Sequence, residues 1–239
     1  MFRLVRFLAF FVLLVGLAIF LVLPAAASPL LTQAVREMGV QADELKVTVD
    51  TFDPALLYGR AARLRVEGRN VALGRATVGR LDLVFGGVSI FDRSFQSLSG
   101  RMEDVVVMAG GIQARAILVE VYGPAESARA TGHFDAEQSA AMVDIAAERA
   151  GFTFDDVQLV DGGLRLTLAN VEARAAIAVD GGALVLRPEY GAPIVLLQPA
   201  ASDPWRLSEA YVSPNGVTVL GVVNTRQVAA RLLGATPSP

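Results

Sequence analysis

Few side chains in this sequence have the types and spacing that catalysis requires. The chain has no cysteine and a single histidine, His133, so a zinc site would need carboxylates for its remaining ligands. His133 lies two residues before Asp135, a position more typical of a polar residue at a strand end. Ser89 lies in Gly-Gly-Val-Ser-Ile-Phe and lacks the glycine that follows the serine in a hydrolase nucleophile elbow. The sequence therefore predicts no metal ion and no other cofactor.

Acidic pairs occur at Glu103-Asp104 and Asp155-Asp156. Neighbouring residues of a strand point to opposite faces, so these pairs are more typical of turns and helix caps than of a catalytic dyad. The chain contains neither a P-loop nor a dinucleotide-binding fingerprint. We predict that the protein is not an enzyme. An envelope hydrolase, with catalytic residues far apart in the sequence, is the least favoured of three interpretations. The other two, given below, involve no catalysis.

One concentrated group of charges lies between Arg60 and Arg80, where six arginines accompany a single acid, Glu67. A basic strand face beside a membrane attracts anionic headgroups by about 1 kcal/mol per residue. A strand face exposed to water carries charges in any case, because they keep it soluble and unaggregated. Both interpretations stay open. The candidate headgroup or membrane-surface residues are Arg60, Arg63, Arg65 and Arg69.

The N-terminal residues have the pattern of a membrane segment. Arg3 and Arg6 precede an uncharged run from Phe7 to Leu23, and a helix is the way such a run satisfies its backbone in lipid. The arginines should stay in the cytoplasm, which places the rest of the chain outside. Residues 1–27 are predicted to be a signal peptide or a membrane anchor. We expect the protein on the extracytoplasmic side of the cell membrane or envelope, anchored or secreted.

Residues 28–233 are predicted to form one domain, followed by a disordered tail at 234–239. Ser28-Pro29 is typical of a helix start, and Gly39 should end that helix. A second helix is predicted from Asp135 to Ala150, with Asp135 as its cap and Gly151 after its end. The apolar stripe of the first helix consists of Leu30, Leu31, Ala34, Val35 and Met38.

Most of the remaining sequence alternates between apolar and polar residues, as strands do. The turns Asp161-Gly162-Gly163 and Asp180-Gly181-Gly182 predict two hairpins. The fold class is therefore α+β, with many antiparallel strands and a few helices. Such strands bury one apolar face on a helix or another sheet, or leave part of it as a groove for an apolar ligand. The predicted strands lie near 45–49, 63–69, 81–85, 117–121, 164–168, 171–177, 184–186 and 217–223.

Several of these segments together resemble the LmeA-like phospholipid-binding family of bacterial cell-envelope proteins. The resemblance begins at Phe52-Asp53-Pro54-Ala55-Leu56-Leu57-Tyr58-Gly59-Arg60 and continues through Leu81-Asp82-Leu83-Val84-Phe85. Ala130-Thr131-Gly132-His133-Phe134-Asp135 and Pro214-Asn215-Gly216-Val217-Thr218-Val219 resemble later parts of the family pattern. The region from Tyr190 to Pro204 departs from it, because three prolines interrupt a stretch expected to be helical.

The resemblance implies a long curved antiparallel sheet packed on one or two helices, similar to tubular lipid-binding folds. It also implies a phospholipid-binding protein that supports cell-envelope maintenance and meets the membrane surface, without nucleic acid as a partner. The alternative is a structural or assembly protein of the envelope whose core is filled by its own side chains. The residues expected to hold acyl chains are Leu64, Val66, Leu83, Phe85, Ile117, Val119, Leu164, Leu166 and Leu168.

Overall fold

The computed structural model describes residues 41–49, 58–73, 76–89, 92, 94–109 and 112–232. The predicted membrane segment from Phe7 to Leu23, the helix predicted after Ser28 and the tail predicted at 234–239 lie outside these residues. No helix within the described ranges is long and apolar enough to cross a membrane.

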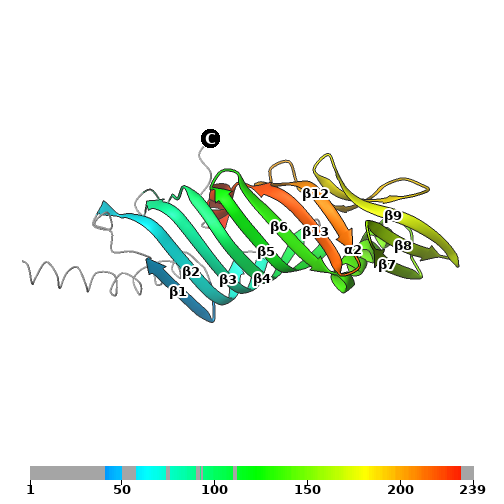
Figure 1. The fold of residues 1–239 in the computed structure, drawn as a ribbon, viewed down its shortest axis with the longest axis horizontal. Coiled ribbons are helices and arrows are strands. Elements are labelled where there is room, and N and C mark those ends of the chain that lie inside the picture. Colours follow the sequence, from blue (N-terminus) through cyan, green and yellow to red (C-terminus); the bar gives the residue numbers. More distant parts are fainter. Residues whose placement is uncertain are drawn as a thin grey trace, which may run out of the picture.

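Two antiparallel sheets and two helices make up the described part of the chain, which confirms a mostly antiparallel fold with few helices (Figure 1). The order of strands in the larger sheet is β1 (Glu44–Val49), β2 (Arg60–Leu73), β3 (Ala76–Ser89), β4 (Ser97–Ala109), β5 (Ile112–Pro124), β6 (Ala128–Asp135), β13 (Gly216–Val223) and β12 (Trp205–Ser213). The order of strands in the smaller sheet is β11 (Ile194–Leu197), β10 (Ala183–Pro188), β9 (Val171–Asp180), β8 (Gly163–Leu168) and β7 (Asp156–Val160). The helices are α2 (Ala136–Arg149) and α3 (Thr225–Leu232).

The strand register gives the larger sheet an apolar face and a charged face. Leu64 lies opposite Phe85 and Val66 opposite Leu83, so apolar side chains of β2 and β3 share one side. Arg65, one residue along, belongs to the other side. We call the side that carries Leu64 and Leu83 the inner face and the side that carries Arg65 the outer face.

Both predicted glycine hairpins are confirmed. Val160 pairs with Gly163 across the first turn, and Asp180 pairs with Ala183 across the second. Gly162 has φ +77°, a backbone conformation that glycine adopts without steric cost. Local turn chemistry therefore determined where the strands of the smaller sheet reverse.

The helix predicted from Asp135 is also confirmed, with its first helical residue at Ala136. The Asp135 side chain accepts a hydrogen bond from the Gln138 backbone N–H at 2.7 Å, which satisfies one free donor of the first turn. One side of α2 contacts β5, β6 and β13 of the larger sheet. The helix also contacts β7 and β11, the two edge strands of the smaller sheet, so that sheet curls around α2.

The region from Tyr190 to Pro204 contains a short strand, β11, between Pro193 and Pro199. β11 pairs with β10, and its Leu196 is 2% exposed in the core beside α2. The prolines therefore bracket an edge strand, a position in a sheet where proline is tolerated.

Candidate functional site

The inner face of the larger sheet is apolar across five neighbouring strands. Two rows of paired residues cross this face from β1 to β5, one from Leu45 to Val119 and one from Val47 to Val121, and neither contains a charged residue. Two buried clusters anchor this surface, one around Val71 and Val78 and one around Phe95 and Leu98. Residues between the two clusters are half-buried, and they comprise Val66, Leu83, Met102 and Val119.

Five of the nine residues predicted to hold acyl chains lie together on this face: Leu64, Val66, Leu83, Phe85 and Val119. All five are half-buried. The Phe85 ring also packs edge-on against Phe95, with ring centroids 5.1 Å apart. The inner face of β2 to β5 is therefore the candidate ligand surface.

The other four predicted residues do not share this surface. Ile117 is 44% exposed, whereas Val119 on the same strand is half-buried. Leu164 and Leu166 belong to β8 of the smaller sheet, where they are 1% and 2% exposed. Leu168, at the end of that strand, is 42% exposed. The structure therefore brings five of the nine residues onto one surface and places the other four elsewhere.

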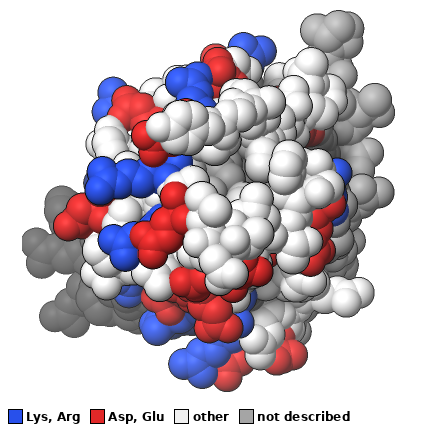
Figure 2. Space-filling model, turned by 90° about the vertical axis from the view of Figure 1, so that its right-hand side faces the viewer, with Lys and Arg blue, Asp and Glu red and all other residues white. Residues whose placement is uncertain are grey.

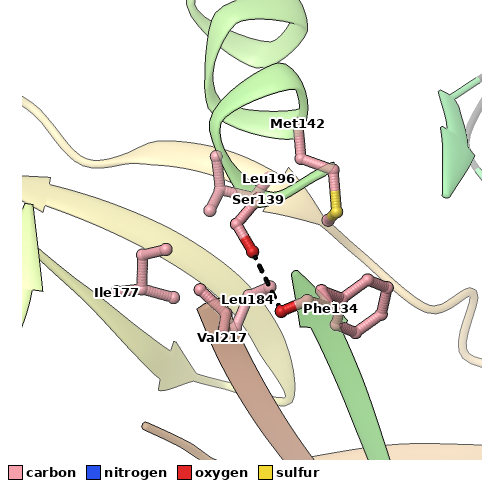
Figure 3. A pocket seen from close by; sticks show the side chains of 7 residues that line it. All are labelled: Phe134, Ser139, Met142, Ile177, Leu184, Leu196 and Val217. Carbon is pink, nitrogen blue, oxygen red and sulfur yellow. Dashed lines mark hydrogen bonds between the residues drawn. The ribbon is translucent and has the colours of Figure 1, made fainter. Parts of the chain in front are cut away.

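Leu164 and Leu166 are buried because the smaller sheet closes on α2. They pack in one cluster with Met142, Val143 and Ala146 of that helix. A void at its centre has a volume of about 10 Å³, room for one water molecule at most (Figure 3). The residues lining it are Phe134, Ser139, Met142, Ile177, Leu184, Leu196 and Val217. This half of the molecule is filled by its own side chains.

The single polar side chain in that lining is also satisfied. The Ser139 hydroxyl donates to the Asp135 carbonyl oxygen at 2.6 Å, with a longer contact of 3.5 Å to the Phe134 carbonyl (Figure 3). It therefore makes its hydrogen bond within the first turn of α2 and leaves no unpaired group to bind a ligand.

Three of the four candidate headgroup arginines, Arg63, Arg65 and Arg69, lie on the outer face of β2. Arg65 donates two hydrogen bonds to Asp82, at 2.8 and 2.7 Å, and lies 3.3 Å from Glu67. Arg69 lies 3.4 Å from Glu44. Arg63 is exposed, and no described carboxylate lies within ion-pair distance of it. Neighbouring strands therefore neutralise much of the charge that the arginine stretch carries.

Arg60, the fourth candidate, is exposed at the start of β2, opposite Ser89. Sequence analysis did not identify Asp82 and Glu44 as partners, because both lie outside the arginine-rich stretch. A hairpin turn near Gly74 with alternating strands on both sides implies that Glu67 and Asp82 lie opposite each other, as the structure has them. This expected register was the sequence signal that could have identified Asp82 as a partner of the β2 arginines.

A shallow hollow of about 310 Å³ lies on this outer face. Arg65, Asp82, Arg101 and Glu120 contribute to its lining, so charges of both signs surround it. At the end of the molecule that the smaller sheet forms, acidic and basic side chains are again interspersed, with uncharged residues between them (Figure 2). Such mixed surfaces suit contact with water rather than with acyl chains.

The Arg65 guanidinium, through its hydrogen bonds, lowers the pKa of Asp82 below its usual value. An acid whose pKa is lower in the folded state stabilises the fold above its unfolded pKa, and this stabilisation disappears as the pH falls through the folded pKa. Replacing Asp82 with asparagine should cost at most about 1 kcal/mol at pH 7, because both side chains are partly exposed to solvent. Urea unfolding at pH 7 and at a pH below the folded pKa of Asp82 measures this difference. An equal cost at both pH values would contradict it.

No group of three or more His, Cys, Asp or Glu side chains within the described ranges is placed to hold a metal ion. Comparison with known proteins found no matching family model, no matching curated protein and no matching solved structure.

Proposed function

We propose that the protein is an extracytoplasmic phospholipid-binding protein that supports cell-envelope maintenance and holds acyl chains on the inner face of the larger sheet. One observation carries the proposal: the contrast between an inner face without charges across β1 to β5 and an outer face covered by ion pairs. Each CH₂ group buried there would contribute about 0.8 kcal/mol, so part of one acyl chain is enough for useful affinity. The proposed role is binding rather than catalysis.

The fold is compatible with this role. An antiparallel sheet of eight strands packs through β12 against a smaller sheet that curls around a helix. A long curved sheet packed on a helix is what the resemblance to LmeA-like proteins and tubular lipid-binding folds implies. Under this proposal residues 1–27 export the chain or anchor it, and residues 28–233 act as the lipid-binding domain.

Lipid analysis of a fragment that comprises residues 28–239 tests the proposal. The fragment should retain phospholipid that native mass spectrometry and solvent extraction detect. Phe85→Gln should reduce the retained lipid severalfold, because an amide on the apolar surface costs roughly 1–3 kcal/mol. Val84→Gln is the matched control, since Val84 is equally half-buried but faces outward, opposite Arg65.

Melting followed by circular dichroism separates loss of lipid from loss of fold in these variants. A folded fragment without any bound phospholipid would contradict the proposal. Equal losses in Phe85→Gln and Val84→Gln would show that the inner face does not hold the lipid.

The membrane-surface role of the outer arginines is part of the same proposal. Of Arg63, Arg65 and Arg69, only Arg63 lacks an acidic partner among the described residues, so replacing all three with glutamine should weaken binding to anionic liposomes about fivefold at low salt. The difference should vanish near 1 M salt, where the Debye length is about 3 Å. Sedimentation with liposomes at both salt concentrations measures it. Unchanged binding at low salt would leave these arginines as a solvated strand face.

A structural or assembly protein of the envelope is the second candidate. The observation that favours it is the filled core around α2, where the void at the centre is about 10 Å³. If the inner face of β2 to β5 is covered in the same way by protein, no lipid is needed. The lipid analysis above distinguishes the two candidates.

A further inference from the structure

The described chain enters the fold on the inner face. The Gln41 carbonyl oxygen accepts a hydrogen bond from the Ala72 backbone N–H at 2.7 Å, which joins the first described residue to β2. The next residue, Ala42, packs against the buried inner-face cluster that includes Val71 and Val78. The described chain therefore begins on the apolar side of the sheet.

Small residues line the inner face along β6. Its inward positions are Ala128, Ala130 and Gly132, opposite Val121 and Val119 of β5. Small residues on a sheet allow a helix or an acyl chain to approach its backbone closely. This feature alone does not identify the occupant.

The sequence before Gln41 supplies a segment of matching chemistry and length. Leu31, Val35 and Met38 recur at the spacing of one helical stripe, with Arg36 and Glu37 away from it. As a helix, residues 29–39 would extend about 16 Å. Strands lie about 4.8 Å apart, so this length covers roughly the width from β2 to β5.

We propose that residues 28–40 dock on the inner face of β2 to β5 and compete there with acyl chains. The apolar stripe of the segment matches the surface beside the point where Ala42 enters it. Docking itself does not depend on the proposed function. The competition rests on the proposed phospholipid binding and would make the segment a built-in regulator of that site.

Disulfide cross-linking of the full-length chain tests the docking, because the protein has no native cysteine. Val35→Cys would be combined in turn with Leu64→Cys, Leu83→Cys or Val119→Cys on the inner face. After mild oxidation in native membranes, mass spectrometry should detect a linked peptide pair for at least one combination. Val35→Cys with Val84→Cys is the control, because Val84 shares β3 with Leu83 but faces outward. A disulfide forms only when the two Cα atoms come within about 7 Å.

Docking is refuted if none of the three inner pairs links, or if the Val84 pair links as efficiently as the best of them. A misfolded variant would not be mistaken for a lack of docking, because each double variant is checked before oxidation for the same melting temperature as the parent.

Labelling with a photoactivatable phospholipid tests the competition in the same membranes. Leu31→Asp combined with Val35→Asp disrupts the apolar stripe. The labelling of peptides from β2 to β5 should then rise on the order of threefold, because the inner face is open to lipid in a larger fraction of the protein molecules. Gln33→Asp, off the stripe, should leave the labelling unchanged. Unchanged labelling in the stripe variant refutes the competition.

The two experiments also separate this inference from the proposed function. Cross-links on the inner face without lipid labelling in any variant would support the docking and contradict phospholipid binding. Labelling of the inner face without cross-links would support phospholipid binding and contradict the docking.

Discussion

Replacing Leu166 with glutamine is expected to lower the free energy of unfolding by about 4 kcal/mol, enough to unfold a domain of ordinary stability. Leu166 is 2% exposed and lies in the cluster that packs β8 against Met142 and Val143 of α2. The substitution removes a buried aliphatic side chain and places an amide in a cluster of buried apolar side chains.

Leu168→Gln is the matched control for Leu166→Gln. Leu168 is two residues along the same strand but is 42% exposed at its end, so its replacement should change stability by less than about 0.5 kcal/mol. Urea unfolding followed by circular dichroism compares the two variants. If Leu166→Gln stayed folded and lost only bound lipid, the smaller sheet would line the ligand site, as the sequence analysis expected.

Local signals in the sequence were sufficient for β8, β9 and β10 of the smaller sheet and for α2, whereas its edge strands β7 and β11 were not predicted. The Asp135 side chain caps the helix, and the glycine turns after Asp161 and Asp180 reverse the strands. Each of these signals acts over about four residues. They therefore appear in the sequence whatever the tertiary arrangement.

The division of the strands between two sheets could not be predicted in the same way. Alternation in β8 is the same as in β2, so Leu166 and Leu64 look equivalent in the sequence. What separates them is the long-range pairing of β6 with β13 and the position of α2, which contacts both edges of the smaller sheet. The same reason applies to Arg65, whose partner Asp82 is seventeen residues away.

Gly100 lies at the centre of the candidate ligand surface, and replacing it with alanine should cost about 3 kcal/mol or more. It lies on β4 between Leu83 of β3 and Val121 of β5, with φ +147°. A Cβ atom there would overlap the Asp82 carbonyl oxygen and lie 2.8 Å from the Leu83 Cα, so both obstacles are backbone. The neighbouring strand must then shift, in addition to the strain of a positive φ at a residue with a side chain.

Gly181→Ala is the control that isolates the contribution of the close approach. Gly181 also has a positive φ, +56°, but a Cβ atom there would meet nothing within 4 Å. Its replacement should therefore cost only the left-handed backbone conformation, about 1–2 kcal/mol. Urea unfolding of both variants measures the difference. A larger cost at Gly100 would show that β3 and β4 are held together at that contact, so that Leu83 and Asp82, on opposite faces, keep their positions together. Equal costs would mean that the strands separate easily there, and the inner face between β3 and β5 would be a deformable surface.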